Sequence, residues 1–199
     1  DYVAGGSDQE IDFIVGWRRT FDSGTTVDVG VLYYYYPGAG SIVPDLNTDF
    51  AEPYVKLTGT TGPVTLTAGV AYAPKQQALA NVSAAPNSRG QKDDNLYLWG
   101  DGALAIGGTP LTAKAHIGYS DGNPGLGPNG TSVAPTGRHW DWSLGVDTTW
   151  RNLTLGLSYV GTDIGGAEAA RLQPNFSKGL DGTGSIADAT IVASMTAAF

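Results

Sequence analysis

An all-β fold, specifically an antiparallel up-and-down β-barrel that crosses a membrane with its strands, is the architecture that this sequence predicts. Three observations lead to it. Apolar residues recur with a period of two along nearly the whole chain, the connections alternate between short and long, and aromatic residues gather at both ends of the apolar faces. The length of 199 residues fits one such domain, spanning residues 1–199.

The composition excludes several other classes of protein. Charged residues make up 15% of the chain and 29 residues are glycine, whereas an average soluble domain has roughly 25% charged residues and roughly 7% glycine. A net charge of −8 argues against binding to nucleic acid. Without cysteine there is no disulfide, thiolate metal site or cysteine nucleophile. No stretch approaches the roughly 18 consecutive apolar residues of a membrane-spanning helix.

Nine segments alternate between apolar and polar residues, and each is predicted to be a strand. They are residues 10–20, 25–36, 50–58, 64–73, 95–104, 110–120, 139–150, 152–161 and 186–199. The third is the weakest, because Pro53 has no N–H to donate to a neighbouring strand. No helix is predicted. In chain order, the seven clearest apolar faces carry Ile11, Phe13, Val15 and Trp17; Val27, Val29, Val31, Tyr33 and Tyr35; Val64, Leu66, Ala68, Val70 and Tyr72; Leu96, Leu98 and Leu104; Leu111, Ala113, Ala115, Ile117 and Tyr119; Trp140, Trp142, Leu144, Val146 and Trp150; and Ile191, Ala193, Met195, Ala197 and Phe199.

Short and long connections alternate between these segments. The short ones are residues 21–24, 59–63, 106–110 and 150–152. The long ones, rich in Gly, Pro, Asn and Asp, are residues 37–48, 74–93, 121–138 and 161–184. Short turns at one end and long loops at the other are typical of outer-membrane barrels. A soluble up-and-down barrel can share this asymmetry. The positions of the aromatic residues distinguish it from an outer-membrane barrel.

The aromatic residues of the apolar faces fall into two belts once the loops set the strand directions. Beside the long loops lie Tyr33, Tyr35, Tyr72, Tyr119, Trp140, Trp142 and Tyr159, and beside the short turns lie Trp17, Trp150 and Phe199. Two such girdles are expected at the two interfaces of a bilayer. No charge lies near the middle of this face in the well-patterned strands, where a Lys or Arg costs roughly 2–4 kcal/mol. We therefore predict a location in the bacterial outer membrane.

The number of strands is expected to be even, with both ends of the polypeptide chain on the periplasmic side. Phe199 ends the last strand on the short-turn side, which places residue 1 in an outer loop and leaves nine strands visible. We expect an amino-terminal portion, of at least one strand, to be missing from this chain. One missing strand makes a barrel of ten strands and three make twelve.

Several stretches share the features of one known family. They are residues 10–12 followed by Gly16 and Trp17, the block 27–38 with its tyrosine-rich end, residues 111–119, residues 141–145 and Phe199. Over nearly the whole chain they resemble the TorF-type porins, small outer-membrane barrels of Gram-negative bacteria. The resemblance implies a signal peptide and several earlier strands, which favours twelve strands over ten. It brings no catalytic residue and no assigned substrate, and Phe199 is similar to the carboxyl-terminal aromatic signal read by the outer-membrane insertion machinery.

The polar faces, which line the lumen in this interpretation, carry more carboxylates than cations. Seven carboxylates, three Lys or Arg residues and one histidine are assigned there: Asp12, Arg18, Asp28, Glu52, Lys56, Asp101, Lys114, His116, Asp141, Asp147 and Asp188. An open lumen of this charge predicts a mild preference for small cations. Pairing between strands, with Asp101 opposite Lys114 and Arg18 beside Asp28, is compatible both with an open path and with a filled, salt-bridged interior.

Catalysis and metal binding are remote alternatives. His116 is predicted to stand opposite Ser143, with Asp141 one inward position away, which makes a loose Ser/His/Asp set of an outer-membrane hydrolase. A lipid hydrolase, however, needs a nucleophile that lipid can reach. Neither His116 nor His139 has a partner at metal-ligand spacing. We expect no catalytic residue, no metal and no cofactor.

Two functions from different classes follow. The first is a porin that passes small solutes or ions by diffusion. The second is a structural or partner-binding barrel with a filled lumen, which holds another protein through its long loops or its lipid-facing wall. The expected partners are outer-membrane lipid and lipopolysaccharide, the barrel insertion machinery during biogenesis, and a protein partner or second copy, but no nucleic acid.

Overall fold

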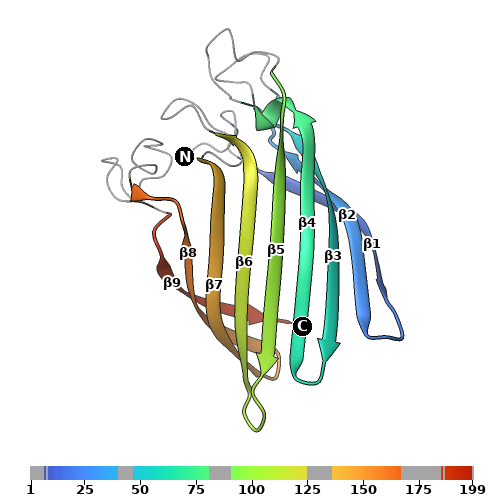
Figure 1. The fold of residues 1–199 in the computed structure, drawn as a ribbon, viewed down its shortest axis with the longest axis vertical. Helices are drawn as coiled ribbons and strands as arrows, with labels where there is room; N and C mark the ends of the chain where they lie inside the picture. Colours follow the sequence, from blue (N-terminus) through green and yellow to red (C-terminus); the bar gives the residue numbers. More distant parts are fainter. Residues whose placement is uncertain are drawn as a thin grey trace.

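A computed structural model describes residues 7, 9–39, 47–80, 91–124, 136–166, 185 and 187–198 of the chain. Within this part, nine strands form one antiparallel sheet in which each strand pairs with its neighbours in the sequence (Figure 1). The strands are β1 (Ile11–Thr20), β2 (Thr25–Tyr35), β3 (Phe50–Thr61), β4 (Val64–Gln76), β5 (Asp93–Ala105), β6 (Leu111–Pro124), β7 (Thr136–Trp150), β8 (Leu153–Thr162) and β9 (Thr190–Ala197). The predicted all-β, up-and-down architecture is confirmed.

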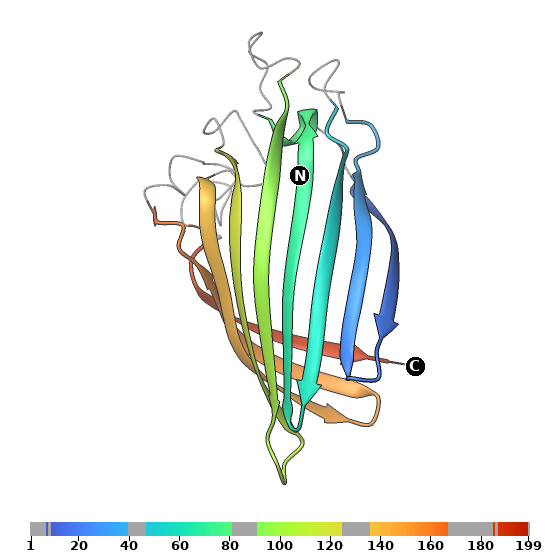
Figure 2. The same ribbon diagram turned by 45° about the vertical axis from the view of Figure 1, so that its right-hand side comes forward.

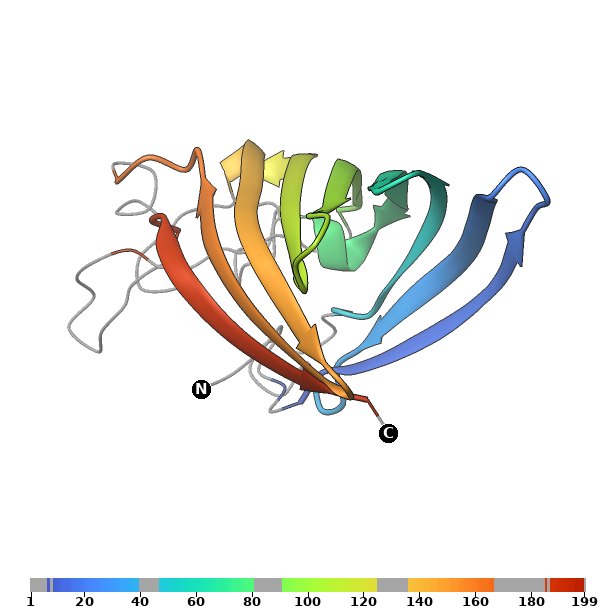
Figure 3. The ribbon, with the colours of Figure 1, turned by 90° about the horizontal axis from the view of Figure 1, so that it is seen from below.

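The sheet is strongly curved. Seen from below, its two edge strands β1 and β9 turn toward the same side (Figure 3). In the part of the chain that the structure describes, β1 pairs with β2 and β9 pairs with β8, and neither has a second partner. The sheet therefore has a concave inner face, a convex outer face and two edges.

The short connections lie together at one end of the sheet (Figure 2). They join β1 to β2, β3 to β4, β5 to β6 and β7 to β8, as the sequence predicts. Each of these hairpins has a residue with positive φ: Gly24 at 80°, Gly62 at 55°, Gly108 at 76° and Arg151 at 54°. Glycine adopts this conformation without strain, whereas Arg151 does so only because the hairpin requires it. We call this the short-turn end and the opposite one the long-loop end.

Polar residues occupy the inner face. Tyr97 of β5 contacts Asp141 of β7 across β6, with its hydroxyl 3.2 Å from a carboxylate oxygen. Side chains two strands apart converge in this way on the concave side of a sheet, which identifies this face as the inner one. The outer face carries the apolar set, which stays exposed: Leu66, Leu144 and Leu157 are 59%, 63% and 52% exposed. Exposed apolar side chains in such numbers indicate a surface made for an apolar surrounding.

The main departures from the predicted elements lie at the long-loop end. β4 extends to Gln76 and continues into a single 3-10 turn, η2 (Gln77–Leu79), where a loop was predicted. Leu79 is 1% exposed and packs with Tyr36, Phe50 and Ala73 in a buried apolar cluster, and this burial favours the turn. No helix in the described part is long and apolar enough to cross a membrane.

Two predicted strands differ in extent. β3 runs for 12 residues despite Pro53, because its pairing with β4 stops at Tyr54, one residue after the proline that cannot donate. β9 begins at Thr190, four residues later than predicted, because residues 187–188 form a bend. Phe199, the predicted insertion signal, lies outside the described residues.

Candidate functional site

The candidate site is a cluster of polar side chains on the inner face, along β5, β6 and β7. His116 of β6 stands opposite Asp101 of β5 and Ser143 of β7 in the strand register. Its Nδ1 lies 2.7 Å from Oδ1 of Asp101, and its Nε2 lies 3.0 Å from Oδ1 of Asp141. Because alternate residues of adjacent strands share a face, three neighbouring strands are enough to bring these groups together.

The two contacts of His116 indicate which protonation state they suit. Ionised carboxylates only accept hydrogen bonds, and a neutral imidazole has one N–H, whereas imidazolium has two. Donation from both ring nitrogens therefore needs imidazolium. The Tyr97 hydroxyl lies 3.0 Å from Nε2 of His116 and donates to Asp141. The His116, Asp101 and Asp141 side chains remain 26%, 44% and 27% exposed, so water reaches the cluster.

Two further ion pairs lie on the inner face. The Lys56 ammonium lies 3.3 Å from a carboxylate oxygen of Asp28, and the hydroxyl of Tyr54 donates to the same carboxylate at 3.0 Å. The Lys114 ammonium lies 2.7 Å from Asp147. Both lysines are more than one-third exposed, so these pairs contribute little to stability and act mainly on the potential above the sheet.

The predicted pairing of Asp101 with Lys114 is wrong. The β5–β6 hairpin closes with Ala105 opposite Thr112, and this register places Asp101 opposite His116. A shift of two residues keeps every side chain on its predicted face and changes only its partner. The sequence determines the face through its period of two, whereas the geometry of the turn determines the partner.

The remaining predicted charges lie where the pattern placed them. Arg18 stands opposite Asp28 as predicted, although the ion pair that Asp28 forms is with the lysine of β3. Asp12 stands opposite Tyr34, whose hydroxyl lies 3.4 Å from Glu52. The strand register thus puts all ten of these predicted residues on the inner face: Asp12, Arg18, Asp28, Glu52, Lys56, Asp101, Lys114, His116, Asp141 and Asp147.

Three aromatic residues of the inner face lie over glycines, and sequence reasoning did not single them out. A Cβ placed on Gly69 would meet the Trp99 indole, and one placed on Gly118 would meet the Tyr97 hydroxyl. Tyr54 covers Gly30 in the same way. A glycine lets a ring approach the backbone closely, so the rings lie on the sheet rather than projecting from it. Glycines in mid-strand at inward positions are the sequence signal that could have revealed these rings.

Two concavities flank the cluster on the inner face. One of about 370 Å³ is bordered by Thr65, Thr67 and Lys114, and the other, of about 360 Å³, by Thr162 and Thr190. His116 and Ser143 border both. The arrangement offers hydroxyls, carboxylates and one imidazole to a solute or to water.

The predicted Ser/His/Asp set does not assemble. Ser143 stands opposite His116 as predicted, but no hydrogen bond joins the two in the described part of the chain. Nε2 of His116 instead faces Asp141 and Tyr97. The ring nitrogen that would take the proton of a serine nucleophile is thus already engaged by a carboxylate. Within the described residues, no group of three His, Asp or Glu side chains is arranged to hold a metal ion.

The long-loop end of the inner face is partly covered by the apolar cluster around Leu79. Gln76 anchors it: its side-chain amide accepts from the Ala51 N–H at 2.8 Å and donates to the Ala51 carbonyl at 2.9 Å. The amide thus replaces the β4 backbone at the point where β4 has separated from β3. The rings of Tyr34 and Phe50 stack beside it with centroids 4.4 Å apart.

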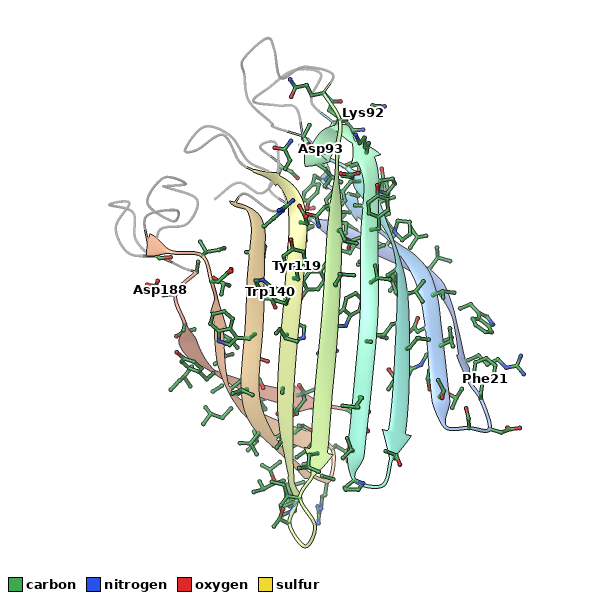
Figure 4. The ribbon with its side chains drawn as sticks, in the orientation of Figure 1. Phe21, Lys92, Asp93, Tyr119, Trp140 and Asp188 are labelled. Carbon is green, nitrogen blue, oxygen red and sulfur yellow. The ribbon has the colours of Figure 1, made fainter. Side chains whose placement is uncertain are left out.

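The predicted girdle residues lie on the outer face. At the long-loop end, three of the tyrosines donate hydrogen bonds to aspartates: Tyr33 to Asp49, Tyr72 to Asp94 and Tyr119 to Asp121. Figure 4 shows Tyr119 close to Trp140, and their ring centroids are 4.9 Å apart. The nine predicted girdle residues in the described part are Trp17, Tyr33, Tyr35, Tyr72, Tyr119, Trp140, Trp142, Trp150 and Tyr159.

The short-turn end has a different chemistry, which the sequence pattern did not reveal. The Arg151 guanidinium lies 4.9 Å from the Trp150 ring, and that of Arg19 lies 5.1 Å from the Phe21 ring. Phe21 marks this end in Figure 4. The aromatic rings of the outer face thus contact carboxylates at the long-loop end and arginines at the short-turn end.

Comparisons with known proteins agree with this architecture. A family model described as "Bacterial protein of unknown function (Gcw_chp)" matches residues 2–199. Among solved structures, the chain is similar to the NanC porin in its rhombohedral crystal form, with a TM-score of 0.61 and 12% identity, covering 96% of this chain and 79% of that chain. No curated protein matches the sequence. At this identity the likeness shows the fold alone, which is that of a porin barrel.

Proposed function

The chain belongs to the Gcw_chp family of bacterial proteins of unknown function, and from this premise we propose that it forms an outer-membrane channel for small solutes or ions. One observation carries the proposal. The sheet presents ion pairs and hydroxyls on its concave face and exposed apolar side chains on its convex face, with aromatic residues at both ends. A barrel in water would need polar side chains on its convex face and apolar ones inside. A barrel in lipid that surrounds an aqueous path needs the opposite arrangement, which is the one found here.

A mild preference for cations is part of the proposal. Six of the carboxylates predicted for the lumen share the inner face with Arg18, Lys56, Lys114 and His116: Asp12, Asp28, Glu52, Asp101, Asp141 and Asp147. The seventh, Asp188, borders the inner-face concavity beside Thr162 and Thr190. Even with His116 charged, the six carboxylates outnumber the four cations. An aqueous path bordered by such a surface concentrates cations.

A closed barrel also requires partners for the two sheet edges. In hydrocarbon an unpaired edge leaves backbone N–H and C=O groups without hydrogen bonds, which costs several kcal/mol per group. We propose that strands outside the described residues pair with β1 and β9, in a barrel of twelve strands, with ten as the alternative. We also propose that the chain is a TorF-type porin, on the motifs that now lie on β1, β2, β6 and β7.

Single-channel recording tests the proposed function. The refolded protein is added to a planar bilayer, and folding is checked by the mobility difference between heated and unheated samples on a denaturing gel. We expect discrete conductance steps and, under a KCl gradient, a reversal potential of the sign that indicates cation preference. Folded protein that gives no steps at any voltage rules the channel out.

A second function, a partner-binding barrel with a filled lumen, has one observation in its favour. The apolar cluster of Tyr36, Phe50, Ala73 and Leu79 occupies inner-face positions at the long-loop end. Recovery of the protein in a stoichiometric complex, together with the absence of conductance, would favour it. Contacts with lipopolysaccharide and with the insertion machinery through Phe199 stay predictions.

We propose no enzymatic role, because the histidine nitrogen needed by Ser143 is engaged elsewhere. Lipid hydrolysis by the purified protein that disappears in Ser143→Ala would contradict this.

A further inference from the structure

His116 occupies an unusual position, because it stands between two carboxylates that come from the strands on either side of it. Asp101 on β5 approaches Nδ1 at 2.7 Å, and Asp141 on β7 approaches Nε2 at 3.0 Å. Both carboxylates therefore share one imidazole. The other two ion pairs described on this face each join one cation to one carboxylate. They are Lys56 with Asp28 and Lys114 with Asp147.

The net charge of this cluster depends on one proton. With imidazolium in place, two carboxylates and one cation sum to −1; with neutral imidazole, the sum is −2. The other groups beside His116 leave this difference intact. Tyr97 on β5 is a phenol that donates to Asp141, and Lys114, on the same strand as His116, is matched by Asp147. Asp188 borders one concavity together with His116 and Asp141 and is a further carboxylate there.

The cluster also faces open space. Asp101 and His116 border the concavity of about 370 Å³, and His116 and Asp141 border that of about 360 Å³. A hydrated cation that enters either concavity meets one of the two carboxylates. Loss of the proton removes a positive charge from this position and frees one of the two carboxylates for such an ion, because the neutral ring keeps only one N–H.

We propose that His116 is the exchangeable counter-cation of the Asp101–Asp141 pair, and that a monovalent cation takes over this role when the imidazole is neutral. The cation preference of the channel thereby depends on whether the imidazole carries its second proton, and histidine is the side chain that most often exchanges a proton near neutral pH. The inference rests on the proposed channel function and names the residues that set its selectivity.

Reversal potentials of single channels under a KCl gradient test the proposal. One added unit charge at about 4–8 Å in water changes local ion populations roughly two- to fivefold. We expect the ratio of K⁺ to Cl⁻ permeability in the unmodified chain to rise by about that factor from pH 5 to pH 8. His116→Gln should keep the high ratio at both pH values, and His116→Lys should keep the low ratio at both.

The matched control is His139→Gln. His139 is the only other histidine of the chain and lies on the same face of the next strand, toward the long-loop end. This variant should keep the full pH dependence. Asp101→Asn combined with Asp141→Asn removes the two carboxylates that attract the cation and should lower the ratio at both pH values.

The outcomes separate this inference from the channel proposal. Conductance with a selectivity that does not change with pH overturns the role of His116 and leaves the channel standing. A pH dependence that survives in His116→Gln but vanishes in His139→Gln also overturns it. Folded protein without conductance overturns both. A charge-changing variant that does not fold will lack the heat-dependent gel shift of a folded barrel. In that case the neutral variants His116→Gln and His116→Asn, which should both lack the pH dependence of the unmodified chain, make the test.

Discussion

Gly69 is predicted to set the position of an aromatic ring on the inner face. A Cβ at this residue would overlap Cζ2 and Cε2 of the Trp99 indole, well inside the 3.0 Å below which such atoms do not approach one another. In Gly69→Ala the indole must therefore leave the sheet. Forcing a side chain out of a packed position in this way costs about 1–3 kcal/mol.

A ring displaced from the backbone of β4 moves toward the space enclosed by the sheet, because Trp99 lies on the inner face. We therefore expect Gly69→Ala to lower the single-channel conductance as well as the free energy of unfolding in lipid vesicles. Trp99→Ala should raise the conductance. The double variant should resemble Trp99→Ala alone, because the added methyl group then meets no ring. Its loss in the free energy of unfolding should therefore be about 1–3 kcal/mol smaller than the sum of the losses in the two single variants.

The matched control is Gly59→Ala, because nothing lies within 4 Å of a Cβ placed on Gly59. Its effect on stability should stay within about 1 kcal/mol, the usual range for a glycine replaced without strain. Urea titration followed by tryptophan fluorescence, with single-channel recording on the same samples, makes both measurements. Equal stabilities and equal conductances for Gly69→Ala and Gly59→Ala would refute the packing argument.

Three further predictions concern the two faces and the long-loop end. Leu144→Lys, on the outer face, should destabilise the folded barrel in vesicles by about 2–4 kcal/mol. Ser143→Lys, at the preceding residue on the inner face, should cost much less. Equal costs would contradict the assignment of the faces. Gln76→Ala removes two hydrogen bonds to Ala51, so unfolding should become about 1–3 kcal/mol easier and hydrogen exchange at the Ala51 amide faster. Unchanged exchange there would show that the amide is protected by something else. Lys114→Gln should change stability by at most about 1 kcal/mol, because its ion pair is largely exposed, yet raise the K⁺ to Cl⁻ permeability ratio at every pH; a lower ratio would count against an aqueous path beside this residue.

Strand positions and faces were predictable because they depend on local chemistry. The period of two that puts Val15 and Trp17 on one face and Arg18 on the other is a property of extended backbone, and it holds whatever the partner strand is. Turn residues such as Gly24 and Gly62 marked the short connections for the same reason. The 3-10 turn at Gln77–Leu79 was not predictable, because its stability comes from packing against residues far away in the sequence.

The candidate site shows the same division. The sequence by itself determined that Asp101, His116 and Asp141 share the polar face of their strands, since alternation along each strand decides that. Only the tertiary structure decided that His116, and not Lys114, stands opposite Asp101, and that the ring bridges two strands. A shift of two residues in a hairpin leaves the pattern of each strand unchanged while replacing every cross-strand partner. The composition of the inner face is therefore local information, whereas the identity of its ion pairs depends on the register between strands, which the closed hairpins set.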